Sequence, residues 1–357
     1  MVKTVSLGTE NAFVGKGALQ QLGAAVSGAA KALVVAGSHA WKAAGETAQA
    51  QLDAAGVPYA MFPFSGYCSE RNVSAIMDTA RANQCDLLIG FGGGKCMDSV
   101  KSASDKLGLP CILVPTSCAT CASNVRLCVW YDDEGRCVPG MFAKQSAQAL
   151  IVDTELIVEK GEARLLASGM MDALAKFPEI DFSMINTPVA ERTAMLITAQ
   201  KVARSNFDYI LENGAAVYQE ALRKECTFAA EQMVYMNIME TGLSSSLVMG
   251  VQQLAVAHMF HDAVATLFHD QRTKHLHGEM VAVGVLLQMH SNGYDEELIQ
   301  RTEAFIRSVN GPLCLSDLDI EPTPENRKLI LDYIASRGYG EPELYAPIEK
   351  AFETIYR

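Results

Sequence analysis

The sequence contains no long apolar run, no run of basic residues and no pair of linked cysteine motifs. None of its uninterrupted apolar segments approaches the roughly 20 residues that a membrane-spanning helix needs. The N-terminal segment MVKTVSLGTENAFVGKGALQQLG lacks the continuous apolar core of a signal peptide. The formal net charge is −12 at pH 7, and no Lys/Arg-rich segment offsets it, so nucleic acid and anionic membranes are disfavoured as partners. We therefore expect a cytoplasmic protein whose partner is a small molecule.

The spacing of the cysteines also does not predict a structural zinc site. The sequence has ten, but its C-x-x-C motif, Cys118–Cys121 (CATC), has no second pair to complete a ligand set. Without an export signal, free thiols are expected rather than disulfides. Hydrophobic residues make up 49% and charged residues 20% of the 357 residues, which is typical of a folded enzyme with room for two domains.

The chain changes character near residue 160. Before that point, short apolar segments with the pattern of buried strands alternate with helical stretches at 40–56 and 74–84. This alternation predicts a parallel sheet that binds ligands at the carboxyl ends of its strands. Further on, Ala-, Leu- and Met-rich segments at 190–223 and 227–270 predict helices. We expect an α/β, Rossmann-like dinucleotide-binding domain over residues 1–160 and an all-α domain over residues 161–357. The expected strands are 31–37, 57–64, 85–94, 109–116 and 148–154.

A glycine-rich turn follows one of these strands in the segment IGFGGGKCMDSVK. Glycines let backbone N–H groups approach an anion, and the N-terminus of the helix expected near Lys95 adds a favourable dipole. The segment therefore suits a phosphate group. It matches neither G-x-G-x-x-G nor a Walker A loop, because Cys96 follows the lysine, and a tight strand–helix turn without a ligand is the alternative. The candidate residues here are Gly92, Gly93 and Gly94, with the hydroxyls of Thr116, Ser117 and Thr120 after the next strand.

Five of the seven histidines lie within residues 257–279. His258 and His261 are three residues apart and therefore share one helical face. Asp172 lies in the otherwise apolar segment SGMMDALAK, near the start of an expected helix, where a carboxylate costs free energy unless it is paired or binds a metal. A catalytic metal needs about three protein ligands, commonly mixed His and carboxylate. The alternatives are packed or capping histidines and a simple helix-terminus charge pair.

Several motifs occur together in a distinctive order: GFGGGKCMDSVK, VPTSCATCASNVRLCVWYDDEG, IVDTELI, RLLASGMMDALAK, AVAHMFHDAV and HLHGEMVAVGVLLQ. On these motifs the sequence resembles the iron-containing (group III) alcohol dehydrogenase superfamily, in its glycerol-dehydrogenase-like branch. The segments SGYCSE, ATCAS, CVWYDDEG and DALAK make it most similar to the hydroxycarboxylate dehydrogenase subgroup. The resemblance implies the dehydroquinate synthase-like fold of this superfamily, NAD or NADP as cofactor, and one divalent metal ion.

The resemblance also implies a metal site made by Asp172, His258 and His277. Zinc is expected there, with iron, manganese and nickel as alternatives. Lys176 stands where many iron-dependent members have a fourth ligand, a histidine, and this favours a three-ligand zinc site. The resemblance places His261 beside the metal on the substrate side, where we hypothesise that it relays a proton.

The cofactor site implied by the resemblance uses residues of the first domain. Gly37 ends a strand where NAD-preferring relatives carry an acid for the ribose 2′-hydroxyl, so NADP is acceptable as well as NAD. Matching residues are Gly92 to Lys95 and Asp98 for the pyrophosphate, and Thr116, Leu127 and Tyr131 for the nicotinamide side.

Some residues depart from the pattern of the glycerol enzymes. Cys121 replaces an aspartate that contacts the polyol, which makes glycerol itself doubtful as a substrate. Arg126 has no expected counterpart, and we hypothesise that it grips a substrate carboxylate, a solvated surface arginine on a hairpin being the alternative. Met170-Met171 stands in place of the usual Gly-x-Gly before the ligand Asp172, and Pro178 is expected to interrupt the following helix.

Together these features predict a metal-dependent NAD(P)(H) oxidoreductase, an alcohol or hydroxycarboxylate dehydrogenase that forms a homo-oligomer. Its substrate would be a small 2-hydroxy acid or vicinal diol and the corresponding carbonyl compound, because such molecules offer two oxygens to a metal. Glycerol dehydrogenase proper is an alternative. A dehydroquinate-synthase-like lyase would need a basic cluster for a phosphate, and only Arg126 and Lys176 are candidates for one. A non-catalytic cofactor-binding homologue is the remaining alternative.

Overall fold

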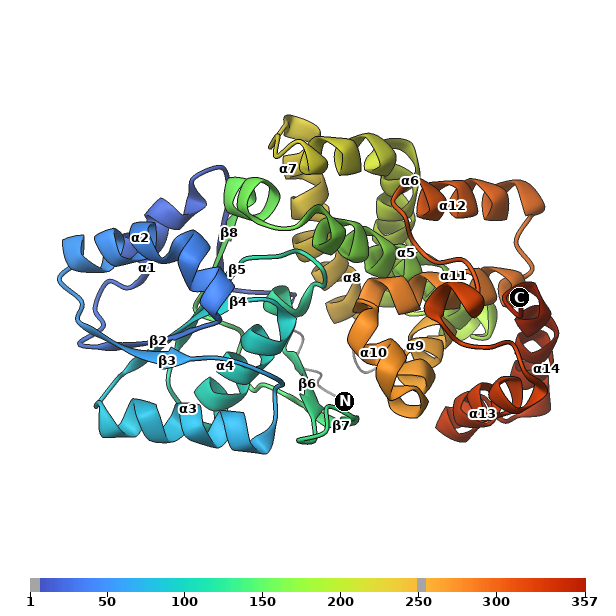
Figure 1. The fold of residues 1–357 in the computed structure, drawn as a ribbon, viewed down its shortest axis with the longest axis horizontal. Helices are drawn as coiled ribbons and strands as arrows, with labels where there is room; N and C mark the ends of the chain where they lie inside the picture. Colours follow the sequence, from blue (N-terminus) through green and yellow to red (C-terminus); the bar gives the residue numbers. More distant parts are fainter. Residues whose placement is uncertain (1–6, 249–254) are drawn as a thin grey trace. The chain divides into compact units, whose positions relative to one another are not determined.

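The computed structural model describes residues 7–248 and 255–357 (Figure 1). The chain divides into two compact units. The first comprises residues up to Leu166 together with Glu220–Ser246, and the second comprises Ala167–Gln219 together with Leu247–Arg357. The chain therefore leaves the first unit, returns to it and leaves it again.

A six-stranded parallel sheet forms the centre of the first unit, with the strand order β1-β8-β5-β4-β2-β3. This confirms the expected α/β architecture. Five strands coincide with the segments expected from the sequence, whereas β1 is not among those because its residues are exposed or only half-buried. The strands are β1 (Asn11–Gly15), β2 (Ala32–Ala36), β3 (Tyr59–Pro63), β4 (Leu87–Gly92), β5 (Cys111–Pro115) and β8 (Ala149–Asp153).

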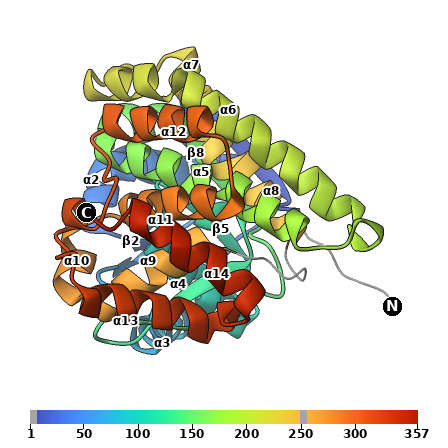
Figure 2. The ribbon, with the colours of Figure 1, turned by 90° about the vertical axis from the view of Figure 1, so that its right-hand side faces the viewer.

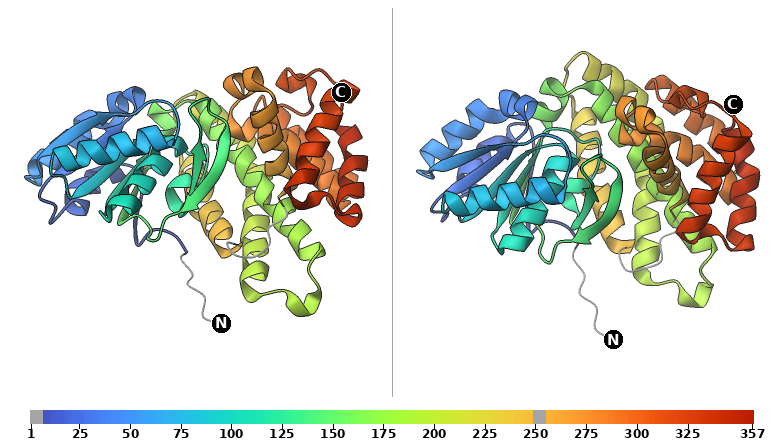
Figure 3. Two further views of the ribbon diagram at one scale, coloured as in Figure 1. Left: turned by 90° about the horizontal axis from the view of Figure 1, so that it is seen from below. Right: turned by 60° about the horizontal axis from the view of Figure 1, so that its bottom comes forward.

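Helix α2 (Ser38–Ala54) illustrates how the sheet is covered. Its buried residues Ala40, Ala44, Ala48 and Leu52 are spaced four apart, so they form one face that packs on the sheet. Burial of a leucine such as Leu52 stabilises the fold by about 1.5–3 kcal/mol. Figures 1 and 3 show α1 (Leu22–Ala25) and α2 on one face of the sheet and α3 (Glu70–Ala82) and α4 (Gly94–Leu107) on the other. The remaining helices of this part are η1 (Ala18–Gln21), α1 (Leu22–Ala25), α3 (Glu70–Ala82), α4 (Gly94–Leu107), η2 (Ala122–Asn124) and η3 (Leu156–Lys160).

An antiparallel hairpin of β6 (Leu127–Tyr131) and β7 (Cys137–Phe142) stands apart from the main sheet. The buried Lys101 of α4 holds its beginning, because the Lys101 ammonium donates to the carbonyls of Ala122, Val125 and Leu127 at 2.7, 2.8 and 2.7 Å. Lys101 also forms a 2.9 Å ion pair with Asp98. The other carboxylate oxygen of Asp98 accepts from the Val129 N–H at 3.1 Å. Helix α4 thus fixes the hairpin through one buried charge pair.

The segment Glu220–Ser246 joins the first unit through specific contacts. The Asn124 side chain donates to the Met239 carbonyl at 3.2 Å, and the Asn237 side chain lies 3.8 Å from the Cys118 sulfur. Lys16 forms an ion pair with Glu231 at 3.6 Å. These contacts make the returning segment an integral part of the first unit.

The second unit is helical, as expected for the second half of the chain (Figure 2). Its centre is α11 (His277–Asn292), buried along nearly its whole length, with α9 (Val256–Leu267) and α14 (Pro342–Ala351) packed against it. The helical segment expected over 227–270 is helical in its described residues but divided into α7 (Phe228–Tyr235), η5 (Met236–Glu240), α8 (Thr241–Val248), α9 and α10 (His269–Lys274). Residues 249–254 lie outside the described part. The other helices after α5 are α6 (Ala194–Leu222), α7 (Phe228–Tyr235), α8 (Thr241–Val248), α10 (His269–Lys274), α12 (Glu296–Ser308) and α13 (Pro324–Ile334), with the short turns η4 (Val189–Glu191), η5 (Met236–Glu240), η6 (Ser316–Leu318), η7 (Ala335–Tyr339) and η8 (Phe352–Thr354).

Helix α5 (Ala163–Ile185) corrects two sequence expectations. Pro178 does not interrupt it, although proline lacks the N–H for one helical hydrogen bond. The residues around it, including Leu174, Ile180 and Phe182, are buried, and burial outweighs the lost bond. The Pro178 carbonyl is held in turn by the Asn292 side chain at 2.8 Å. Asp172 consequently lies in the interior of a long helix rather than near its start.

All ten cysteines are free thiols, and all except Cys137 are buried. Burial raises the pKa of Cys111, for example, to about 11, so such thiols stay protonated and unreactive. Within the described ranges, no helix combines the length and apolar character that crossing a membrane would require.

Candidate metal centre and cofactor loop

Three side chains from separate helices of the second unit converge on one point. Asp172 comes from α5, His258 from the first turn of α9, and His277 is the first residue of α11. The Asp172 Oδ1 atom lies 3.2 Å from His258 Nε2 and 3.0 Å from His277 Nε2. One ligand atom of each of the three residues lies within 4.8 Å of the others. The structure thus brings together the three residues that the sequence suggests as metal ligands.

Close packing at two glycines sets this convergence. Gly278 is the second residue of α11, and an added Cβ there would collide with the backbone of Ser168 in α5. One turn and a half further on, a Cβ at Gly284 would collide with the backbone of Ala257 in α9. Because only glycine permits these approaches, α11 lies against both helices that carry the other candidate ligands.

Tertiary hydrogen bonds fix the first turn of α9, which carries His258. The first N–H groups of a helix have no partner within the helix. Here the N–H of Ala255 donates to the Tyr339 hydroxyl at 2.6 Å, that of Val256 to Gln288 at 2.8 Å, and that of His258 to Glu179 at 2.9 Å. The position of His258 is therefore determined by side chains from other helices.

The start of α11 is fixed in a similar way. The Glu279 carboxylate accepts from the Leu276 N–H at 2.8 Å, which is half of a capping box and ends the preceding loop at His277. The Gly278 N–H donates to the Ser168 hydroxyl at 3.0 Å. The segment HGE is thus a helix start that points His277 toward α5.

The donor set suits a divalent metal of the zinc type. A tetrahedral ion with bonds of about 2.0–2.1 Å keeps its ligand atoms about 3.3 Å apart. The distances from Asp172 to the two imidazoles come close to that spacing. The Asp172 side chain is 5% exposed and that of His277 33%, so the cluster is closed on one side and open on the other. A substrate could reach a fourth position from the open side.

Each histidine of the cluster has a further partner for its second nitrogen. His258 Nδ1 lies 2.8 Å from the Glu179 Oε1 atom, and the Glu179 side chain is fully buried. His277 Nδ1 lies 3.0 Å from His261 Nε2, and His261 Nδ1 lies 2.9 Å from the Asp262 carboxylate. His261 therefore lies next to the cluster, with both ring nitrogens engaged.

The charges of the cluster follow from these contacts. Burial opposes ionisation of Asp172, yet its short contacts with the imidazoles of His258 and His277 hold the pKa of its carboxyl well below the usual range. Burial also disfavours the charged form of His258, but the charge of Glu179 and the bonds to both carboxylates raise its pKa to about 9. Burial and the neighbouring His261 lower the pKa of His277 to about 4. Asp172 and His277 are thus in forms that could bind a metal, whereas His258 would have to release a proton to do so.

Lys176 lies one turn after Asp172 on α5, and its positive charge helps to lower the pKa of the Asp172 carboxyl. A protonated ammonium has no lone pair with which to ligate a metal. Lys176 at the position of a fourth ligand therefore agrees with three protein ligands.

The glycine loop of the first unit lies between the end of a strand and the start of a helix, as the sequence predicts. Strand β4 ends at Gly92, Gly93 caps α4, and Gly94 is the first residue of that helix. A Cβ at Gly93 would lie 3.3 Å from the Ser117 hydroxyl oxygen, and one at Gly94 would lie 3.0 Å from that of Thr120. The Thr116 N–H donates to the Gly92 carbonyl at 3.0 Å. The sequence-predicted glycines and hydroxyls are thus neighbours at the carboxyl ends of β4 and β5, beside a helix N-terminus.

The other sequence-predicted cofactor residues fall into two groups. The Lys95 ammonium lies 4.2 Å from the centre of the Tyr67 ring, and that ring lies 5.2 Å from the Tyr131 ring. Lys95 and Tyr131 are therefore joined through Tyr67 near the glycine loop. Asp98 is different, because its carboxylate is buried and engaged by Lys101 and the hairpin. Leu127 offers its carbonyl to the same lysine.

The two residues predicted to contact substrate lie in the first unit. Cys121 is buried, with its sulfur 4.0 Å from the Ser245 hydroxyl oxygen. Arg126 is half-buried and donates from Nη1 to the Lys144 carbonyl at 3.0 Å, and its buried Nε has no hydrogen-bond partner among the described residues. A guanidinium that is only partly satisfied keeps the carboxylate hypothesis open, and both assignments stay predictions.

Sequence reasoning missed Glu179 and Asp262, which lie beside the predicted metal cluster of the second unit, and Tyr67, which lies beside Lys95 and Tyr131 in the first unit. Glu179 follows Asp172 by two helical turns, a spacing that puts both on one face of α5 and could have identified it. Tyr67 belongs to the SGYCSE segment, but nothing in that segment indicates its stacking. For Asp262 no sequence signal distinguishes a partner of His261 from a solvated acid.

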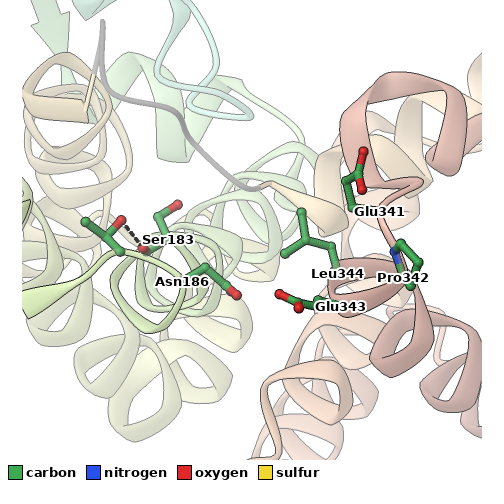
Figure 4. A pocket seen from close by; sticks show the side chains of 7 residues that line it. Ser183, Asn186, Glu341, Pro342, Glu343 and Leu344 are labelled. Carbon is green, nitrogen blue, oxygen red and sulfur yellow. Dashed lines mark hydrogen bonds between the residues drawn. The ribbon is translucent and has the colours of Figure 1, made fainter.

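A separate pocket of about 520 Å³ lies between the end of α5 and the start of α14 (Figure 4). It is lined by Ser183, Asn186, Thr187 and Glu341–Leu344, none of which the sequence suggests as functional. Its two carboxylates, Glu341 and Glu343, belong to exposed residues, so it has the chemistry of solvated surface rather than of a binding site.

Comparison with known proteins identifies the class. A family model described as iron-containing alcohol dehydrogenase matches residues 9–154. Glycerol dehydrogenase of Thermotoga maritima is 31% identical over 262 residues, covering 72% of this chain and 69% of the relative. Hydroxycarboxylate dehydrogenase A of Escherichia coli is 30% identical over 259 residues, with 72% and 69% covered. The chain belongs to the iron-containing alcohol dehydrogenase family and is an alcohol oxidoreductase, as the sequence motifs suggest.

Solved structures agree with the fold. A probable glycerol dehydrogenase from Sinorhizobium meliloti superposes with a TM-score of 0.84 at 22% identity, covering 99% of this chain and 98% of that one. Sulfoacetaldehyde reductase from Bifidobacterium kashiwanohense, in complex with NAD+, gives a TM-score of 0.74 at 19% identity, with 100% and 99% covered. The expected fold is confirmed, and the family implies a nicotinamide cofactor and a metal ion.

Proposed function

We propose that this chain is a zinc-type, nicotinamide-dependent dehydrogenase that interconverts a small 2-hydroxy acid or vicinal diol with its carbonyl compound. The observation that carries the proposal is the convergence of Asp172, His258 and His277 from three helices, with one side open. Iron, manganese and nickel remain alternatives to zinc, because this donor set binds each of them.

The chemistry divides between bound groups and the chain. The metal, when bound, acts as a Lewis acid on the substrate oxygen, and the nicotinamide supplies or accepts the hydride. Asp172 and the two histidines would hold the metal, and the partly exposed His277 side would leave room for substrate. Glu179 holds the His258 ring in one orientation, and such outer partners tune ligand basicity. A substrate with two adjacent oxygens fits because both can face the same ion.

The glycine loop is proposed to bind the cofactor diphosphate. The N-terminus of α4 offers backbone N–H groups and a favourable dipole, and Lys95 adds a positive charge. The end of β2 carries Gly37 rather than an acid, so no carboxylate opposes a 2′-phosphate there. Both NAD and NADP are therefore proposed as cofactors, with the hydroxyls of Ser117 and Thr120 beside the loop.

Glycerol is the second candidate substrate, because several relatives are glycerol dehydrogenases. Cys121 argues against it, since a buried thiol is a much weaker acceptor for a hydroxyl than the carboxylate of glycerol enzymes. Arg126 favours an acid instead, because a guanidinium binds carboxylates through two hydrogen bonds. The dehydrogenase relatives support an oxidoreductase over the lyase and the non-catalytic alternatives.

Cofactor oxidation tests the proposal directly. The protein is stripped of metal, reloaded with Zn²⁺ or left apo, and mixed with NADH or NADPH and a panel of 2-oxo acids, hydroxyketones and aldehydes. We expect turnover only after reloading, with 2-oxo acids or hydroxyketones the best substrates, and no turnover in Asp172→Ala. Absence of turnover with every compound in both states would overturn the proposed function. A higher kcat/KM for glycerol oxidation than for any 2-hydroxy acid would replace the substrate assignment.

A further inference from the structure

A hydrogen-bonded chain leads away from the candidate metal site on the side of His277. The Asp262 Oδ1 atom lies 2.9 Å from His261 Nδ1, and His261 Nε2 lies 3.0 Å from His277 Nδ1. The opposite nitrogen of His277 is the one that points to Asp172, at 3.0 Å. The His261 and His277 ring centres are 4.1 Å apart. Asp262 and His261 are consecutive residues of α9, so one short segment contacts His277 at the ring nitrogen opposite the one that faces Asp172.

The carboxylate at the end of the chain decides where the ring hydrogens lie. An ionised carboxylate only accepts hydrogen bonds, so His261 Nδ1 carries a hydrogen and donates it to Asp262. A neutral imidazole has one such hydrogen, which leaves His261 Nε2 as an acceptor. His277 Nδ1 therefore donates to His261, and the lone pair of His277 remains on Nε2. That is the nitrogen that faces Asp172 and the proposed metal.

We infer that Asp262 and His261 are a positioning pair that holds His277 in the tautomer and orientation needed to ligate the metal. The inference rests on the proposed metal site and gives His261 a role other than the proton relay suggested by the sequence. Both nitrogens of His261 are engaged, and the residue is only 9% exposed, so a substrate proton has no free atom to reach on this ring. His258 has its own partner, Glu179, and needs no such pair.

The experiment measures zinc affinity, which does not depend on turnover. Metal-free protein is titrated with Zn²⁺ in competition with a chromophoric chelator. We expect Asp262→Ala and His261→Ala to weaken zinc binding about 10- to 100-fold, as loss of an outer partner of a ligand does. His261→Gln should bind zinc nearly as tightly as the unmodified protein, because its amide oxygen can still accept from His277 Nδ1.

The glutamine variant separates positioning from proton transfer. An amide cannot carry a proton, so a relay at His261 would lose kcat equally in His261→Gln and His261→Ala, with zinc affinity unchanged in both. That outcome would overturn the inference. A positioning role predicts that His261→Gln keeps both zinc affinity and most of kcat. It also predicts that Asp262→Ala recovers kcat when zinc is saturating.

Two controls make the result specific. Asp270→Ala removes an exposed carboxylate eight residues further along and should leave zinc affinity unchanged. Asp172→Ala tests the metal site itself. Full zinc binding by Asp172→Ala would contradict the proposed metal site. If Asp172→Ala loses zinc binding while Asp262→Ala and His261→Ala bind zinc normally, only this inference would be overturned. If Asp262→Ala fails to fold, as judged by circular dichroism of the apo protein, Asp262→Asn replaces it. Its amide supports either tautomer of His261, and weaker zinc binding is again expected.

Discussion

At the scale of single residues, Glu179 makes two of the contacts that fix the position of His258. Its Oε1 atom accepts from both the backbone and the side chain of His258, at 2.9 and 2.8 Å. Its Oε2 atom is buried and has no hydrogen-bond partner among the described residues. Burial of a carboxylate with one oxygen that has no hydrogen-bond partner costs free energy. The hydrogen bonds that orient His258 and cap α9 offset this cost.

We expect Glu179→Gln to weaken zinc binding about 10- to 100-fold. The amide can accept one bond at Oε1, but it lacks the charge that strengthens the bond from His258. Competition titration of the apo protein measures the effect, and Glu191→Gln, an exposed glutamate on η4, is the matched control. Unchanged affinity in a folded Glu179→Gln protein would show that His258 needs no anionic partner.

Lys101 allows a residue-scale prediction in the first unit. Lys101→Met would leave Asp98 buried without its counter-charge and three carbonyls without their donor. Breaking a buried pair in this way costs about 3–5 kcal/mol. Urea unfolding followed by circular dichroism should show the loss, and Lys144→Met at an exposed position should not. A loss below about 1 kcal/mol, the range of surface pairs, would contradict this role.

At the scale of elements, the metal site depends on how closely α11 approaches its neighbours. The convergence of three ligands from helices distant in sequence needs the contacts at Gly278 and Gly284. The backbone conformation does not require glycine at either position, because both residues are helical. Their requirement arises from the neighbouring helix backbones, which give no room for a methyl group.

Gly284→Ala is therefore expected to push α11 away from α9 and to move His277 relative to His258. Overpacking of this kind costs about 1–3 kcal/mol and should also weaken zinc binding. Thermal unfolding and zinc titration are the measurements. Gly37→Ala is the control, because its added Cβ would meet only the Phe64 carbonyl oxygen at 3.9 Å, an ordinary contact. Equal stability of Gly284→Ala and Gly37→Ala would contradict the role of close helix packing in forming the metal site.

The elements also show where sequence reasoning succeeds. Strands β2, β4, β5 and β8 are predictable because they are buried apolar runs. Strands β6 and β7 have mixed exposure and pair with each other, and the sequence suggests only a hairpin near Arg126, without bounds for its strands. The three candidate ligands came from motif resemblance, since His258 and His277 do not differ chemically from the other histidines of their segment. The contact of Asp262 with His261 depends on ring orientation, which a linear pattern does not contain.

At the scale of the whole molecule, a metal bound by Asp172, His258 and His277 would tie together α5, α9 and α11. Binding to the folded state alone stabilises it by about 2.7 kcal/mol at a metal concentration 100 times the dissociation constant. We expect chelators to lower the thermal midpoint of the holoprotein and Zn²⁺ to restore it. Scanning calorimetry checks this, and Asp172→Ala should show no shift with zinc. A thermal midpoint that does not change when metal is removed or added would indicate that packing alone holds the three helices together.

The return of the chain to the first unit has a consequence for how the protein is made. A ribosome synthesises residues in order, and N-terminal domains generally fold as they emerge. Here the first unit remains incomplete until Glu220–Ser246 has been synthesised, because that segment supplies the partners of Asn124, Cys118 and Lys16. All the residues of the first unit are therefore available only after the intervening residues Ala167–Gln219, which include the first metal-ligand candidate, have been synthesised. A fragment that ends at Leu166 would expose the apolar and polar surface that this late segment covers.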